Sequence, residues 1–132
     1  MQARDGTERD RVEAALRRSE IQLRAITESA LNAIVMMDPE GRLCYWNSAA
    51  ERMLGYPSAD AMGHDLHELF VPTRYHAAMH AAFPTFLRTG KGPAIGRTLD
   101  LAARHRDGHE IPVQLSLAAV AIDGRWHAVG VV

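Results

Sequence analysis

The chain has little of several features that would point to particular functions. It contains a single cysteine, Cys44, among 132 residues, which excludes an internal disulfide framework and fits a reducing compartment. No apolar run is long enough to cross a bilayer, and no secretory signal pattern opens the chain. The net charge is only −1, so no general field favours nucleic acid or an anionic membrane. These absences predict a cytoplasmic piece that contacts neither nucleic acid nor a membrane.

Sequence signatures of catalysis are also missing. No Ser-His-Asp or Cys-His arrangement can be defended. Gly90, Gly92 and Gly96 lack the preceding strand and following helix of a phosphate-binding loop. Hydrophobic residues make up 47% of the chain and charged residues 23%, which is ordinary for a globular domain with a core. We therefore expect one globular domain with no catalytic residues.

The first thirty residues divide into two segments. Residues 1–11 are polar and are predicted to be a flexible N-terminus. Residues 12–30 are predicted to form an amphipathic helix, because apolar positions alternate in spacings of four and three, as in a coiled coil. Two interpretations remain open: the helix packs on its own domain, or it is a signal helix that makes a homodimer. Charged residues on its other faces favour the dimer. The positions of the seam are Val12, Leu16, Ser19, Leu23, Ile26 and Ala30.

Three turn signals organise the predicted strands. Asp38-Pro39-Glu40-Gly41 separates the apolar run 33–37 from a second strand over residues 42–46. Asp107-Gly108 separates two alternating segments, 99–106 and 111–117, and Asp123-Gly124 precedes a final strand over 126–132. Pro112 lacks a backbone donor, so its strand is expected to begin beside an edge or a bulge. The hairpins indicate an antiparallel sheet with helices gathered on one face.

Short helices are expected between the first two strands and the last three. Ser48-Ala49-Ala50-Glu51 has the spacing of a capping box, although Asn47 could also cap this helix. Gly55 is placed to end it. A longer helix is predicted from Pro72 to Thr89. Pro84 lies inside this helix, and a kink or break is expected there.

Three segments in this order resemble the PAS domain family: AIVMMDPEGRLCYWNSAAERMLGY, AMGHDLHELFVPTRY and FLRTGKGPAIGRTLDLAARHRDGHEIPVQLSL. The resemblance covers residues 18–132. It implies an α+β fold with a five-stranded antiparallel sheet and short helices on one face, preceded by the N-terminal amphipathic helix. The PAS domain itself would span residues 31–132.

The resemblance also implies a function. PAS domains are sensor modules of bacterial signalling proteins such as sensor histidine kinases, diguanylate cyclases and phosphodiesterases. By this resemblance the chain would be a regulatory domain with no enzymatic turnover of its own. This domain would bind a small ligand between sheet and helices, and helical linkers would pass the signal to a covalently linked output domain beyond this piece. The alternative is a ligand-free PAS domain that acts in dimerisation and protein interaction. The expected pocket residues are Met36, Leu54, Phe70, Met79, Phe83, Leu115 and Trp126.

The cofactor is left open, with haem as a candidate. Haem-binding members carry a histidine on the long helix, where this chain has His76 and His80 on one face. Arg97 resembles an arginine that some oxygen-sensing members point at bound gas. The competing interpretation, that both histidines are surface residues, is favoured by the resemblance, which places Met79 at the ligand position. Flavin is disfavoured because Cys44 lies on a predicted strand rather than in a photoactive helix motif.

The remaining histidines do not predict a metal site. His64 and His67 are three residues apart on a short helix with Asp65 and Glu68, but no further ligands follow at a defined spacing. A solvated helix face explains them better than a small metal-dependent enzyme. His105 and His109 flank the Asp107-Gly108 turn, where polar side chains are expected in any case.

Overall fold

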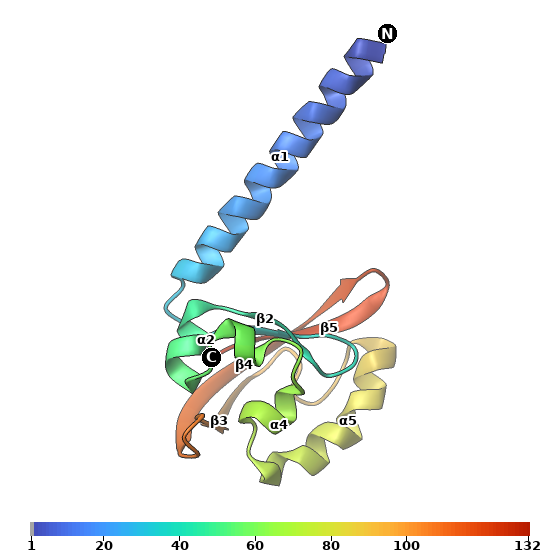
Figure 1. Cartoon of the computed structure of the whole chain (residues 1–132). Helices are drawn as coiled ribbons and strands as arrows, with labels where there is room; N and C mark the ends of the chain where they lie inside the picture. Colours follow the sequence, from blue (N-terminus) through green and yellow to red (C-terminus); the bar gives the residue numbers. More distant parts are fainter. Residues whose placement is uncertain (1) are drawn as a thin grey trace. The chain divides into compact units, whose positions relative to one another are not determined.

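The computed structural model describes residues 2–132, with side chains from residue 7 onward. It divides the chain into two units, the first ending at Ala30 and the second spanning Leu31–Val132. The first unit is one helix, α1 (Gln2–Ser29), drawn in blue in Figure 1. It begins before Val12, where the apolar spacing predicts a start, and the flexibility of residues 1–11 stays a prediction. Within the described residues, no helix has the length and apolar character needed to cross a membrane.

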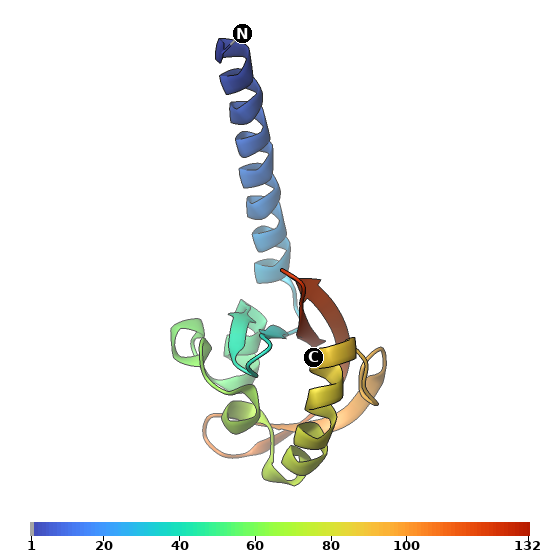
Figure 2. The ribbon, with the colours of Figure 1, turned by 90° about the vertical axis from the view of Figure 1, so that its right-hand side faces the viewer.

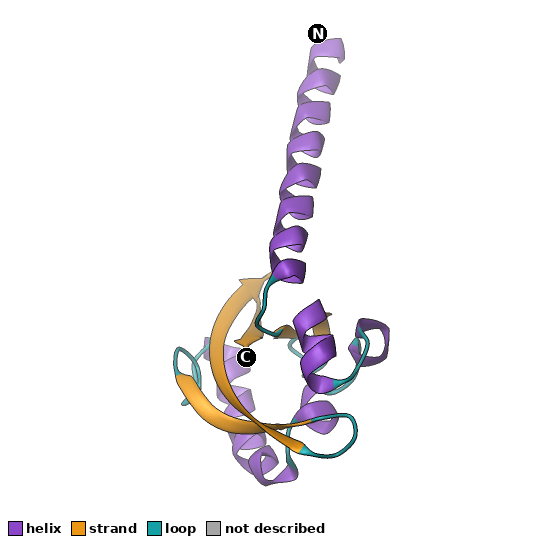
Figure 3. Cartoon of the chain, turned by 90° about the vertical axis from the view of Figure 1, so that its left-hand side faces the viewer, coloured by secondary structure: helices purple, strands orange, loops and turns teal. Residues whose placement is uncertain are grey.

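In the described part of the chain, the second unit is built on a five-stranded sheet in which all neighbouring strands are antiparallel. The strand order is β2-β1-β5-β4-β3, so the last strand of the chain lies in the middle of the sheet. The longer strands are strongly bent (Figure 3). This sheet confirms the predicted α+β fold. The strands are β1 (Ile34–Met37), β2 (Leu43–Trp46), β3 (Thr98–Arg104), β4 (Glu110–Ile122) and β5 (Arg125–Val131).

The three predicted hairpin turns are present, and two show clearly how local chemistry forms them. Between β1 and β2, the Asp38 carboxylate accepts hydrogen bonds from the backbone N–H groups of Glu40 and Arg42, at 2.9 and 3.0 Å. Between β4 and β5, Asp123 and Gly124 have φ values of 51° and 74°. Two successive left-handed residues form the turn whose twist matches that of the flanking strands.

Strand β4 is longer than its sequence pattern predicts. The alternation of large apolar residues ends at Leu117, whereas β4 continues to Ile122 and stays paired with β5. The last residues of β4 are mostly alanines, which give no strong period-two signal. Pro112 pairs with Ala102 of β3, and β5 joins the ladder only from Ser116 onward. One side of Pro112 therefore lies beyond the end of β5, as expected for a residue that cannot donate.

Short helices connect β2 to β3, and Figure 1 shows α4 and α5 on one side of the sheet. Figure 2 shows the helices following one another from α2 to α5. Buried side chains of β1, β2, α2 and α4 form the main core, in which the rings of Trp46 and Phe70 pack with centroids 5.7 Å apart. The helices are α2 (Ser48–Leu54), α3 (Ser58–Ala61), α4 (Leu66–Phe70), the 3₁₀ turn η1 (Thr73–Tyr75) and α5 (His76–Thr89).

The start of α2 corrects the predicted capping box. Asn47, not Ser48, is the N-cap, and its side-chain oxygen accepts from the Ala50 N–H at 3.0 Å. The Glu51 carboxylate turns away from the cap and accepts from the backbone N–H of Ser58 at 2.9 Å. Glu51 thereby ties the end of α2 to the start of α3. Gly55 ends α2 in the left-handed conformation, with φ of 83°, as predicted.

The helix predicted over 72–89 is also corrected in its details. It consists of η1 followed by α5, and α5 continues through Pro84 without a break. Pro84 is exposed, so the carbonyl that loses its helical partner lies toward water, which can satisfy it. Gly90 then ends α5 with φ of 70°, and its N–H donates to the Phe86 carbonyl at 2.8 Å.

Candidate functional site

An apolar cavity lies between the sheet and the helices of the second unit. Its volume is about 340 Å³, and its walls come from β1, β3, β4, β5, α2, α4 and α5, with the loop after α5 closing one side. From the sheet, Val35, Leu99 and Leu117 face it. His67 and Tyr75 are the wall residues with polar side-chain atoms, and the other side chains are aliphatic or aromatic. A volume of this size, with few polar groups, is typical of small-ligand sites, which occupy roughly 300–1,000 Å³.

The structure places five of the predicted pocket residues in the wall of this cavity and two outside it. Met36 lies outside because side chains alternate along β1, so that Val35 and Met37 face the cavity and Met36 faces away. Trp126 shares a strand face with Ala128 but is not part of the cavity wall; it packs against the buried cluster of Met37, Phe86 and Ala128. The five in the wall are Leu54, Phe70, Met79, Phe83 and Leu115.

The predicted haem contacts do not face the cavity. The Nε2 atom of His76 lies 2.8 Å from the carbonyl oxygen of Val71, which occupies this ring nitrogen. His80 is exposed on α5, and Arg97 is exposed in the loop before β3. Neither histidine nor the arginine is part of the cavity wall. The arrangement of these three residues therefore does not fit haem bound in the cavity.

Cys44 is likewise placed away from the cavity. It lies half-buried on β2, and its Sγ is 3.5 Å from the carbonyl oxygen of Met36. Desolvation by burial, together with the charge of Asp38, raises the pKa of the thiol. A raised pKa keeps the thiol protonated, and a protonated thiol is a poor nucleophile.

His67 is the functional candidate that the sequence pattern missed. The pattern places it on a solvated face, whereas it is only 5% exposed and lies in the cavity wall. The spacing of His67 to Phe70 is i, i+3, which puts both on one face of α4 and could have indicated burial. Its ring packs against those of His80 and His76, with centroids 5.5 and 6.2 Å away. Three imidazoles thus meet at the junction of α4 and α5.

Burial lowers the pKa of His67 below its ordinary value of 6.5. The neighbouring imidazoles of His80 and His76 lower it further, while the Asp65 carboxylate, 4.0 Å from Nδ1, opposes the shift. His67 is therefore neutral at neutral pH. A neutral imidazole in an apolar wall can donate or accept one hydrogen bond to a molecule in the cavity.

This lowered pKa predicts a loss of stability on mild acidification. As pH falls below 6.5, the unfolded chain protonates at residue 67 before the folded chain does, so the free energy of unfolding decreases. We expect His67→Phe to show a smaller decrease than the unsubstituted chain between pH 7.5 and pH 5.5, measured by urea unfolding. His64→Gln, at an exposed histidine, is the control and should leave the decrease unchanged. An equal decrease in all three chains would contradict the assignment.

The fold and the comparison with known proteins together identify the family of this chain. A curved antiparallel sheet closed by short helices over an apolar cavity defines a small α+β domain. The chain belongs to the PAS fold family, whose family model matches residues 21–132. It is accordingly a sensor-type regulatory domain.

Two relatives and two solved structures illustrate the family. The sensor protein FixL of Bradyrhizobium diazoefficiens is 30% identical over 132 residues, and an uncharacterized protein of Azorhizobium caulinodans is 28% identical over 107 residues. These alignments cover 97% and 81% of this chain, which spans only 25% and 15% of the two relatives. The PAS domain of an HTR-like protein from Haloarcula marismortui superposes with a TM-score of 0.73 at 20% identity, covering 92% of this chain and 96% of that one. A PAS domain from a two-component sensor histidine kinase gives 0.66 at 18% identity, covering 86% and 96%.

Proposed function

We propose that this PAS domain senses a small, largely apolar molecule that binds in the cavity between the sheet and α4 and α5. The cavity itself carries the proposal, because it is large enough for such a ligand and is lined almost entirely by apolar side chains. The neutral imidazole of His67 offers one polar contact in that wall. The ligand class that fits is therefore an apolar body with at most one or two polar groups.

Signalling would require two states of the domain that bind the ligand with different affinity. Residues of β5 and α5 both line the cavity, so a ligand there contacts the middle strand and the longest helix of this unit. A shift in their packing would reach an output domain through helical linkers. A kinase, a diguanylate cyclase or a phosphodiesterase would fit as the output domain, and the cytoplasm as its compartment. The likeness to FixL and to a histidine kinase PAS domain supports this role.

A substitution that fills the cavity tests this function. Ala82 lies in the cavity wall on α5, and the preceding Ala81 is exposed on the same helix. Ligands would first be identified by native mass spectrometry of the purified chain and by thermal-shift screening of small apolar compounds. Ala82→Phe should weaken binding of such a ligand roughly 5- to 150-fold, because the added ring takes up ligand space and overfilling a packed site costs roughly 1–3 kcal/mol. Ala81→Phe should bind normally.

The pair Ala82→Phe and Ala81→Phe also shows which results would contradict the proposal. If Ala82→Phe and Ala81→Phe bind the ligand equally well, with both variants folded by circular dichroism, the ligand lies outside this cavity. If neither mass spectrometry nor screening finds a ligand, the sensing proposal fails and a ligand-free interaction role replaces it.

A second function, dimerisation through α1, is favoured by the apolar side chains of that helix. Val12, Leu16, Leu23 and Ile26 are 59–67% exposed. They recur at the spacing of a coiled-coil seam, which two copies of the helix can bury against each other. We propose that the chain is a homodimer through this seam, with or without a ligand in the cavity.

Sedimentation equilibrium of the whole chain tests the seam. Leu23→Glu should raise the dimer dissociation constant by about a hundredfold or more, because an unpaired charge in an apolar seam costs roughly 3 kcal/mol. Ile21→Glu is the matched control, since Ile21 is also exposed, at 63%, but lies off the seam. A monomeric unsubstituted chain, or equal effects of both substitutions, would contradict the proposal.

A further inference from the structure

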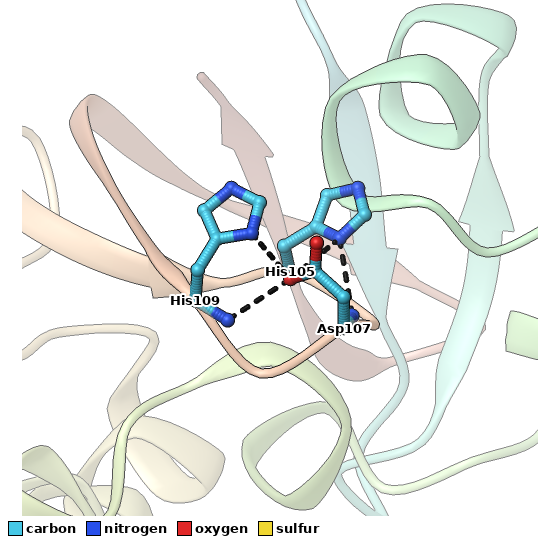
Figure 4. A group of neighbouring side chains, drawn as sticks. All are labelled: His105, Asp107 and His109. Atoms are coloured by element: carbon cyan, nitrogen blue, oxygen red, sulfur yellow. Dashed lines mark hydrogen bonds and ion pairs between the residues drawn. The ribbon is translucent and has the colours of Figure 1, made fainter.

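At the β3–β4 turn, three side chains of types that can bind metal ions bring their nitrogen and oxygen atoms close together. His105, Asp107 and His109 each place one donor atom within 4.8 Å of the others (Figure 4). The Nδ1 atom of His105 lies 3.2 Å from Oδ1 of Asp107, and Nδ1 of His109 contacts the same oxygen. The two imidazole rings are stacked, with centroids 4.7 Å apart. Both Nδ1 atoms therefore converge on one carboxylate oxygen.

The backbone of the turn fixes this arrangement before any ligand is present. The His105 N–H donates to the His109 carbonyl at 2.8 Å, which brings the two histidines opposite each other across the hairpin. The His109 N–H donates to Oδ1 of Asp107 at 3.0 Å, which turns the carboxylate inward. Gly108 closes the turn with φ of 98°. The three residues thus occupy alternate positions of one hairpin, with their side chains gathered together.

The spacing of His105 Nδ1 and Asp107 Oδ1, 3.2 Å, is close to the roughly 3.4 Å between two ligands that each lie about 2.1 Å from one tetrahedral metal ion. The backbone N–H of Asp107 donates to Nδ1 of His105 at 3.1 Å, so without metal this hydrogen bond uses the one in-plane lone pair of that nitrogen. The same nitrogen lies 3.2 Å from a carboxylate oxygen, which is also an acceptor. A metal ion held by Nδ1 and this oxygen would replace the Asp107 N–H as the partner of the Nδ1 lone pair. The second imidazole, on His109, supplies a further nitrogen beside that oxygen.

We propose that His105, Asp107 and His109 form a binding site for one divalent first-row transition metal ion, such as Zn²⁺. Two imidazole nitrogens and one carboxylate oxygen suit such ions, whereas Mg²⁺ and Ca²⁺ take oxygen ligands. Three protein ligands leave a coordination position open for water or another donor, because Zn²⁺ usually takes four. This site is separate from the apolar cavity and is independent of the sensing proposal.

The turn is also tied to the body of the domain. The Arg106 N–H donates to the Leu54 carbonyl at 2.9 Å, at the end of α2. The ring of His105 lies against Gly55, where an added Cβ would come within 2.7 Å of it. A metal ion that fixes His105 would therefore also fix this junction, and binding to the folded chain alone raises its melting temperature.

Isothermal titration calorimetry with ZnCl₂ at pH 7.5, on the untagged chain, tests the proposal. We expect one Zn²⁺ per chain, a higher melting temperature with Zn²⁺, and no heat with MgCl₂. His105→Gln and His109→Gln should each weaken Zn²⁺ binding at least about tenfold, since even outer-shell substitutions cost 10–100-fold. His80→Gln, in the other histidine cluster, is the control and should bind Zn²⁺ as tightly as the unsubstituted chain.

Several results would overturn the site. Zn²⁺ binding that is unchanged in both turn variants, or lost in His80→Gln, would place the metal elsewhere. Absence of binding at millimolar Zn²⁺ would show that a proton, not a metal ion, joins these residues. His109 is 58% exposed, so His109→Gln is expected to fold normally, and its circular dichroism spectrum without metal checks this.

Discussion

Asn47→Ala is expected to lower the free energy of unfolding by roughly 3 kcal/mol, a large part of the 5–15 kcal/mol of an ordinary domain. Asn47 is fully buried and joins the start of α2 to the segment of residues 32–34. Its side-chain oxygen accepts from the N–H groups of Ala50 and Ile34, at 3.0 and 2.9 Å, and its amide donates to the Asn32 carbonyl at 3.0 Å. Alanine removes the cap of α2 and also leaves the half-buried N–H of Ile34 without this acceptor. Urea unfolding followed by circular dichroism measures the loss.

A second N-cap provides the matched control for Asn47. Asp65 caps α4 by accepting from the N–H groups of His67 and Glu68, but its side chain is 39% exposed. Asp65→Ala should therefore cost only about 1 kcal/mol, because water can replace the lost acceptor. Equal losses in the two variants would show that Asn47 acts only as a helix cap and does not hold β1 to α2.

Gly90→Ala is expected to cost roughly 3 kcal/mol, from two separate causes. Gly90 has φ of 70°, and a side chain in this left-handed region costs about 1–2 kcal/mol. A Cβ at this position would also lie 2.6 Å from ring atoms of Trp126, closer than real Cβ atoms approach. The end of α5 and the start of β5 would have to move apart. Thermal and urea unfolding, each followed by circular dichroism, measure the cost.

Gly63→Ala separates the two causes. Gly63 has φ of 82°, yet a Cβ there would meet no atom within 4 Å. This variant should lose only the backbone contribution of about 1–2 kcal/mol. Adding Trp126→Leu to Gly90→Ala should recover part of the steric cost, because the two positions are in contact. If both glycine variants lose the same stability, the contact with Trp126 does not constrain the end of α5.

Much of the fold could be predicted because its signals are local. Asp38, Asp107-Gly108 and Asp123-Gly124 have turn chemistry that acts within a few residues, and the structure forms a hairpin at each. The N-cap of α2 is not determined by local sequence alone. Asn47 and Ser48 are both good N-cap residues, and the choice of Asn47 depends on its contacts with residues 32 and 34, which are distant in the sequence.

The site could be predicted only in part, because a residue of the cavity wall must point toward the cavity as well as have suitable chemistry. The run 33–37 is apolar throughout, so its composition does not reveal that Met36 faces away from the cavity. His67 is polar, so the sequence pattern predicts that it faces water, whereas it is buried on the same face of α4 as Phe70. Trp126 has the correct face but is not part of the cavity wall, a distinction that depends on where α5 ends.

The position of β5 in the sheet has a consequence for the order in which the domain can fold. A ribosome synthesises β5 after every other strand, yet β5 lies between β1 and β4. Before it is made, the nascent chain has two separate hairpins, β1–β2 and β3–β4, and isolated hairpins are marginally stable in water. Completing the sheet pairs Ile34 with Val131, near opposite ends of the unit, and such distant pairing slows folding. Co-translational folding of this domain must therefore wait for its last strand.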